Sequence, residues 1–97
     1  DREKEIVLAK VPDITDSLAD QVARIVRSIR QLELKKSPSV SETIDWARTL
    51  VLLGKEHVDA ETAVATVNIL LKDQSDIAKA TKELAADSQA DGRPGVT

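Results

Sequence analysis

The sequence predicts an all-α fold, a small bundle of four to five helices, and three observations lead to this prediction. Large apolar residues recur at spacings of three and four along most of the chain, which is the pattern of amphipathic helices. The hydrophobic residues make up 41% of the chain and are almost all aliphatic, with one Trp and no Phe or Tyr. The length of 97 residues suits one domain, since domains commonly contain about 100 to 200 residues. We place this domain at residues 1–86 and a disordered tail at residues 87–97.

The first helix is expected at residues 2–10, where apolar residues lie among charges. It should end before Val11-Pro12, because proline disfavours helix at the residue that precedes it. The second helix is expected to begin at Ser17, whose hydroxyl can cap the helix together with Asp20 three residues later. Its apolar stripe consists of Leu18, Val22, Ile25, Val26, Ile29 and Leu32. The pattern stops before Lys35-Lys36-Ser37-Pro38, where charges and proline interrupt it.

The third helix is expected to begin at Ser39-Val40-Ser41-Glu42. This is a Ser-x-x-Glu capping box, in which each side chain can satisfy one free backbone N–H group of the first turn. Its apolar stripe consists of Val40, Ile44, Ala47, Leu50 and Val51, with Trp46 and Leu53 beside it. Gly54 is placed to adopt the left-handed conformation that ends many helices.

Two further helices are expected after the loop at residues 55–58. Asp59 can cap a fourth helix, whose apolar positions are Ala60, Val64, Val67, Leu70 and Leu71. A fifth helix is expected from Asp73 or Ser75, with a thin apolar edge at Ile77, Ala80 and Leu84 and an outward pair of Lys79 with Glu83. From Asp87 onward Ser, Gln, Asp, Gly and Pro dominate, which predicts the disordered tail.

Composition and charge argue against several classes of partner and location. Fourteen Lys and Arg residues against seventeen Asp and Glu give a net charge of -3, the opposite of the basic surface that nucleic-acid binding needs. We therefore expect no nucleic-acid partner. The absence of cysteine excludes disulfides and is compatible with a reducing cytosol, so we expect a cytoplasmic location. The longest apolar run, Leu50–Leu53, is far too short to span a bilayer, and the charged start is not a signal peptide, so we expect no membrane insertion.

The chain lacks the groups that catalysis and cofactor binding need. Gly54 is the only glycine before residue 92, so there is no glycine-rich loop to hold phosphates. His57 is the only histidine, and we expect it to be exposed in a loop, because one imidazole is not a zinc ligand set. No serine has an evident histidine partner for nucleophilic catalysis. We expect no catalytic residue, no metal site and no cofactor in this chain itself.

Two features leave both a structural and a functional interpretation open. Arg24, Arg27 and Arg30 form a basic cluster, which is either a solvated face or a contact with a phosphate or an acidic partner. Trp46 either packs at the edge of the core or anchors an interface. We keep these four residues as candidate partner-interface residues.

Three stretches together resemble the C-terminal helical lid of MoxR-type AAA+ ATPases. The first is Arg-Glu-Lys-Glu-Ile-Val at residues 2–7, followed by Val11-Pro12. The second is Ser-Pro-Ser-Val-Ser-Glu-Thr-Ile-Asp-Trp-Ala-Arg-Thr-Leu at residues 37–50, which is the most specific of the three. The third is His-Val-Asp-Ala-Glu at residues 57–61. The resemblance covers residues 1–86 and not the tail.

The resemblance implies that this chain has no enzymatic activity by itself. It also implies that the chain is part of a protein that hydrolyses ATP. In that family the Walker motifs, sensor 1 and the arginine finger lie in an upstream ATPase domain, which would hold ATP and Mg²⁺. The lid folds over the nucleotide and moves with its hydrolysis in a ring-shaped oligomer. The implied partners are the ATPase domain, the neighbouring ring subunits and a protein with a von Willebrand factor A domain, in a chaperone-like motor.

The resemblance also implies which residues face the nucleotide. Ile6 and Val7 of the first helix would border the adenine pocket, and Ser39 and Ser41 stand near the position of the sensor 2 arginine. No arginine occupies that position, although a helix N-terminus can itself face an anion through its N–H groups. The alternative for Ile6 and Val7 is that they seal the bundle. The alternative for the whole chain is a free-standing adaptor that binds an acidic partner through the arginine cluster.

Overall fold

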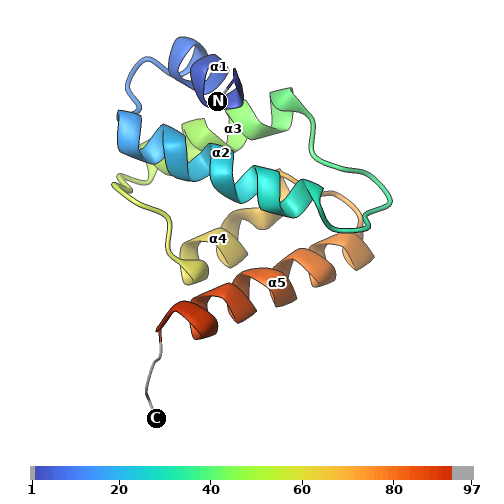
Figure 1. The fold of residues 1–97 in the computed structure, drawn as a ribbon. Helices are drawn as coiled ribbons and strands as arrows, with labels where there is room; N and C mark the ends of the chain where they lie inside the picture. The colour runs from blue at the N-terminus through green and yellow to red at the C-terminus, as the bar shows by residue number, and fades with distance from the viewer. Residues whose placement is uncertain (1, 93–97) are drawn as a thin grey trace.

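The computed structural model describes residues 2–92, which form five α-helices and one 3-10 helix (Figure 1). In chain order they are α1 (Arg2–Lys10), α2 (Asp16–Arg30), α3 (Val40–Leu52), α4 (Ala60–Thr66), η1 (Val67–Ile69) and α5 (Gln74–Gly92). Residues 2–92 contain no β-strand. The predicted all-α fold is therefore confirmed.

The start of α2 differs from the prediction. Its N-cap is Thr15, whose side chain accepts a hydrogen bond from the backbone N–H of Leu18 at 3.1 Å. Ser17 lies inside the first turn, where its hydroxyl accepts a hydrogen bond from the side chain of Gln21 at 3.3 Å. The earlier start brings Asp16 into the first turn, where a negative charge interacts favourably with the helix dipole. The predicted cap at Ser17 is wrong by two residues.

Both predicted ends of α3 are confirmed. Ser39 and Glu42 form the reciprocal capping box at its start. At its end, Gly54 has a φ of 75°, and its N–H group donates to the carbonyl of Val51 at 2.9 Å. The next N–H group, that of Lys55, donates to the carbonyl of Leu50 at 3.0 Å. This pair of hydrogen bonds is a Schellman motif, which needs a left-handed residue and so favours glycine.

The second half of the chain is less regular than predicted. Asp59 caps α4 by accepting the N–H of Thr62 at 2.8 Å, as expected. The α-helix then ends at Thr66 and tightens into η1, so Val67, Leu70 and Leu71 are buried while Ala60 and Val64 are only half-buried. Asp73 caps α5 as expected, because its Oδ1 accepts the N–H groups of Ser75 at 2.9 Å and Asp76 at 3.1 Å.

The helix α5 continues through Gly92, so the expected start of the tail at residue 87 lies inside a helix. The remainder of the expected tail, residues 93–97, lies outside the described residues.

The core joins two groups of helices. The helices α1, α2 and α3 pack on one another, and α4, η1 and α5 form a second group that meets α3 at η1 (Figure 1). Trp46 lies between the groups with no exposed surface, and its indole Nε1 donates to the hydroxyl of Thr66 at 2.7 Å. The largest fully buried aliphatic side chains of the same core are Leu18, Ile29, Leu50, Leu70 and Leu71. Trp46 is the only aromatic residue of the chain. The rest of the core is therefore filled by aliphatic side chains, as the composition predicts.

Candidate functional site

The N-terminal turn of α1, the C-terminal turn of α2 and the start of α3 meet at one end of the bundle. Arg30 connects them, because its guanidinium forms a two-point ion pair with Glu3 of α1, in which Nη2 to Oε2 measures 2.9 Å. The same guanidinium donates from Nε and Nη2 to the carbonyl of Pro38, at 3.2 and 3.1 Å. Pro38 immediately precedes the cap of α3. Thr43 of α3 also forms a side-chain hydrogen bond with Glu3. We call Glu3, Arg30, Pro38 and Thr43 the junction.

The charge state of Glu3 follows from its surroundings at the junction. Burial raises the pKa of Glu3, but hydrogen bonds from Arg30 and Thr43 and the nearby charges of Arg30 and Arg27 lower it by more. The net result is a pKa below the ordinary value of 4.5. Glu3 therefore stays ionised at neutral pH, which suits a two-point bond to a guanidinium.

The start of α3 is exposed but already occupied by its own capping groups. The backbone N–H of Ser39 donates to Oε1 of Glu42 at 2.9 Å, and the N–H of Glu42 donates to the hydroxyl of Ser39 at 3.2 Å. The hydrogen bond from the Ser39 backbone is the main reason why the pKa of Glu42 is lowered, and the charges of Lys36 and Lys72 lower it further. The surface around this helix start thus carries two lysines beside one carboxylate.

A buried carboxylate, which is absent from the candidate residues predicted above, holds the loop that leads into α3. Asp76 of α5 is 1% exposed. Its Oδ1 accepts the backbone N–H of Lys35 at 2.8 Å, and its Oδ2 accepts that of Lys36 at 3.0 Å. Its burial could have been predicted from its position, because Asp76 stands four residues before Ala80 and so lies on the apolar face of α5.

The predicted nucleotide-facing residues differ in how much of their surface is exposed. Val7 has no exposed surface and packs in the core, and a place beside a nucleotide stays a prediction for it. Ile6 is half-buried. Ser39 and Ser41 are exposed at the start of α3, and the ion pair of Arg30 with Glu3 brings this start close to the first turn of α1.

The predicted interface residues do not form one surface. Arg24 is exposed and pairs with Asp20 one turn earlier, at 3.2 Å. Arg27 is also exposed, whereas Arg30 turns inward to the junction and is only 31% exposed. Trp46 has no exposed surface and packs in the core, and a role at an interface stays a prediction for it. His57 is exposed in the loop before α4, as expected.

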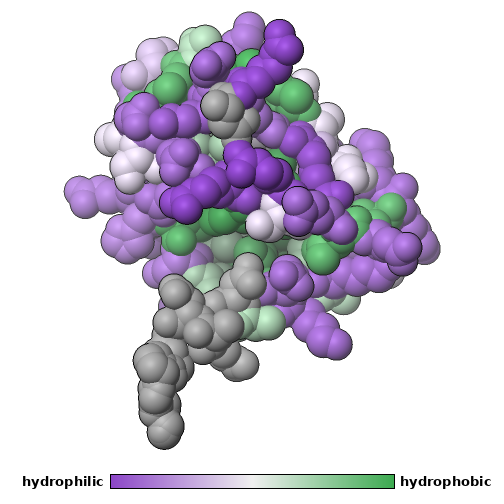
Figure 2. All heavy atoms as spheres, in the orientation of Figure 1, coloured by the Kyte–Doolittle hydropathy of each residue, from purple (hydrophilic) through white to green (hydrophobic). Residues whose placement is uncertain are grey.

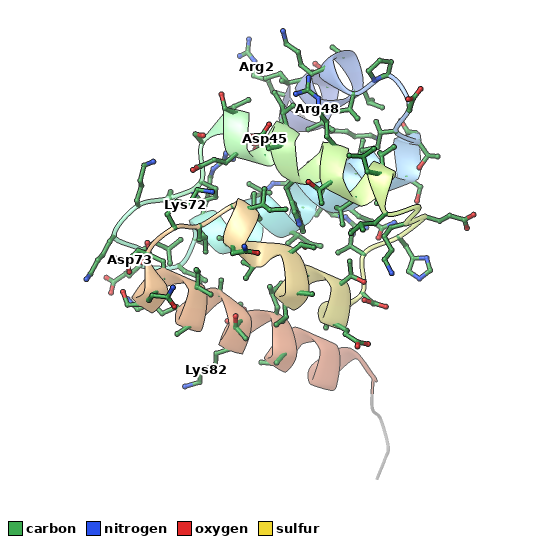
Figure 3. All side chains as sticks on the ribbon, turned by 180° about the vertical axis from the view of Figure 1, so that it is seen from behind. Arg2, Asp45, Arg48, Lys72, Asp73 and Lys82 are labelled. Atoms are coloured by element: carbon green, nitrogen blue, oxygen red, sulfur yellow. The ribbon has the colours of Figure 1, made fainter. Side chains whose placement is uncertain are left out.

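A second surface feature lies at the other end of α3. Leu52 is 86% exposed and Leu53 is 55% exposed, the largest exposed fractions for big apolar side chains among the described residues. Beside them is a hollow of about 230 Å³, which we call the apolar hollow, lined by Val11, Pro12, Asp13, Arg48, Val51 and Leu52. Arg48 and Asp45 lie on the outer side of α3 (Figure 3), with Nη1 of Arg48 3.9 Å from Oδ1 of Asp45.

The face of the molecule shown in Figure 2 is mainly polar. In the view of Figure 2, hydrophilic side chains cover most of the surface, and hydrophobic side chains show in smaller areas between them. Among the side chains that the structure describes, those of residues 2–86, no group of three or more His, Cys, Asp or Glu is arranged to hold a metal ion. No helix in the described part of the chain combines the length and the apolar character needed to cross a membrane.

Comparison with protein-family models, with curated proteins and with solved structures finds no match for this chain.

Proposed function

We propose that residues 1–86 are the helical lid of a MoxR-type AAA+ ATPase and take part in nucleotide-dependent motion and ring assembly. One observation carries the proposal. The two segments that the resemblance assigns to the nucleotide, the first helix and the start of the third, come from distant parts of the sequence. Arg30 joins them at the same end of the bundle through Glu3 and the Pro38 carbonyl.

The way α1 is held also supports a lid. A lid transmits motion only if the helix that enters it moves together with the rest. Besides the junction, Lys4 of α1 pairs with Asp16 at the start of α2, at 3.1 Å, and Val7 is buried in the core. These contacts would make α1 move with α2 and α3 as one body.

The chemistry of ATP hydrolysis would belong to another domain of the same protein. This chain has no glycine-rich phosphate loop, so ATP and Mg²⁺ would be held by an upstream ATPase domain. No arginine occupies residues 39–42 at the start of α3, and the cations whose charges lower the pKa of Glu42 there are Lys36 and Lys72. The lid would therefore contribute by closing over the nucleotide, and a direct arginine contact with the γ-phosphate is not part of the proposal.

The proposal includes the partners and the setting that accompany such a lid. They are the upstream ATPase domain, neighbouring subunits of a ring and a protein with a von Willebrand factor A domain, in a chaperone-like motor of the cytoplasm. The alternative, a free-standing adaptor using Arg24, Arg27 and Arg30, has less support. Arg30 is engaged with Glu3 and Pro38, so this face offers a partner fewer cations than the sequence suggests.

The test measures ATP hydrolysis by the longer chain that contains this sequence, with and without residues 1–97. Assembly state is followed by light scattering. A working lid predicts that removal abolishes turnover or ring formation while nucleotide binding by the rest persists. The isolated chain should show no turnover. Unchanged turnover and assembly after removal, or hydrolysis by residues 1–97 alone, would contradict the proposal.

A further inference from the structure

The segment between α2 and α3, residues 31–39, is held in place largely by side chains from other parts of the chain. We call this segment the linker loop. Lys79 of α5 donates from Nζ to the carbonyl of Glu33 at 2.7 Å. Asp76 accepts the N–H groups of Lys35 and Lys36, and Arg30 donates to the carbonyl of Pro38. Side chains from α5 and α2 thus fix both the middle and the end of the loop.

Asp76 has the most demanding environment of these side chains. At 1% exposure, a carboxylate is expensive to bury unless hydrogen bonds replace its water. Its two oxygens accept N–H groups from two consecutive residues, which fixes the orientation of two successive peptide groups, the one before Lys35 and the one between Lys35 and Lys36. The side chain of Lys35 turns to another carboxylate, with its Nζ 3.9 Å from Oδ2 of Asp73. Both oxygens of Asp76 therefore bind the backbone of the linker loop.

We infer that Asp76 is a positioning residue for the start of α3, the end of the domain that faces the nucleotide in the proposed lid. The second of these peptide groups ends at Lys36, three residues before the N-cap Ser39, and the charge of Lys36 acts on Glu42. The contact links α5 to the loop that enters α3, although Asp76 lies 41 and 40 positions after the two residues that it holds. This inference rests on the proposed function for its effect on ATP, and on the structure alone for its effect on the loop.

Asp76→Asn is the sharpest variant, because it keeps the shape of the side chain. The amide oxygen can still accept one N–H group, whereas the amide NH₂ group would face the other N–H group and cannot accept it. Lys79→Met is the matched control. It removes another α5 contact to the same loop, but the Lys79 side chain is exposed, so water can replace it at the Glu33 carbonyl.

The first measurement is amide hydrogen exchange on the 97-residue chain under native conditions. In the unmodified chain, the amides of Lys35 and Lys36 should exchange far more slowly than those of an unstructured loop, although they belong to no helix. In Asp76→Asn their exchange should speed up roughly ten- to a hundred-fold, as expected for loss of a hydrogen bond to a charged group. The amide resonances of Ser39–Glu42 should shift, while exchange in α2 stays within about twofold.

Two results would overturn the positioning role. One is unprotected Lys35 and Lys36 amides in the unmodified chain, a measurement that does not depend on whether any variant folds. The other is a uniform acceleration throughout the helices of Asp76→Asn, which would make Asp76 a general stabilising residue. Lys79→Met should leave the exchange of Lys35 and Lys36 within about threefold, and an equal effect of both variants would also count against Asp76.

The second measurement uses the longer ATPase chain. Asp76→Asn should raise KM for ATP several-fold and change kcat less, because the start of α3 would be misplaced while the ATPase domain is intact. Lys79→Met should change neither constant. If removal of residues 1–97 has no effect on turnover, the lid proposal fails. If removal abolishes turnover but Asp76→Asn leaves KM unchanged, the lid stands and the positioning role fails.

Discussion

The two ends of α3 are equally well capped but differently connected to the rest of the molecule. Its start has a capping box and its end has a Schellman motif, both made of neighbouring residues. Only the start is surrounded by side chains from α1, α2 and α5, through the junction and the linker loop. The end has one long contact to the backbone of another helix, from Nη2 of Arg48 to the carbonyl of Lys10 at 3.4 Å, and exposes Leu52 and Leu53.

This difference separates two tasks that sequence motifs are often assumed to perform together. A cap decides where a helix begins or ends, because it satisfies the N–H or carbonyl groups of the terminal turn. The direction in which that end points is decided by contacts with distant residues such as Glu3 and Asp76. The start of α3 has both, so it is the better candidate for a surface that must be held in a fixed geometry.

The largest effect is expected at Trp46, which lies between the two ends of α3. Trp46→Ala removes a fully buried ring and leaves the hydroxyl of Thr66 without its donor, so it should lower the free energy of unfolding by about 3–5 kcal/mol. Urea denaturation checks this, with Leu52→Ala as a control that should change stability little because Leu52 is 86% exposed. Equal effects of the two substitutions would contradict the central position of Trp46.

A smaller loss is expected from breaking the junction at the start of α3. Arg30→Met leaves Glu3 and the Pro38 carbonyl without their partner and should cost about 1–3 kcal/mol, the usual range for hydrogen bonds to charged groups. The matched control is Arg24→Met on the same helix, whose pair with Asp20 is exposed on both sides and should contribute at most about 1 kcal/mol. Similar losses in both variants would mean that the junction is only an ordinary surface ion pair.

The junction should also make stability depend on acid. The pKa of Glu3 is lowered in the folded state, so its ionised form stabilises the fold above the ordinary value of 4.5. That contribution is lost as the pH falls below 4.5 through the folded-state pKa. Denaturation at several pH values between neutrality and pH 3 should show a smaller acid-dependent loss in Arg30→Met than in the unmodified chain, because the main partner of Glu3 is gone. Parallel pH profiles would sink this explanation.

The end of α3 has its own prediction, which concerns the backbone only. Gly54 has a φ of 75°, and a Cβ placed there would meet no atom within 4 Å. Gly54→Ala should therefore cost about 1 kcal/mol, from the left-handed conformation alone. A thermal melt checks this, and Gly54→Asn should recover part of the loss because Asn tolerates that conformation better. A loss well above 2 kcal/mol would show that the end of α3 is more tightly constrained than its contacts indicate.

The same distinction explains what the sequence predicts and what it misses. The capping box, Gly54 and Asp59 are correctly predicted because each motif consists of residues within a few positions of one another. The break of the fourth helix at η1 is missed because apolar spacing alone does not reveal where a helix tightens. The inward turn of Arg30 is not predicted because its partner Glu3 lies 27 residues away. The role of Asp76 is missed because its partner Lys35 lies 41 residues away. The full burial of Trp46 depends on how distant helices pack, which no local sequence pattern determines.

The smallest effect on stability is expected at the apolar end of α3, and it sharpens the comparison most directly. Leu52→Ser and Leu53→Ser should each change the free energy of unfolding by less than about 0.5 kcal/mol, because surface substitutions that break no contact usually do so little. Urea denaturation of both variants beside Arg30→Met measures the contrast between the two ends. If Leu52→Ser lowers the free energy of unfolding as much as Arg30→Met does, this end of α3 is as constrained as the start. The exposed leucines would then contribute to stability. If both serine variants keep full stability, the fold does not need these leucines. Repeating light scattering on the longer chain with the same variants then shows whether ring assembly depends on them.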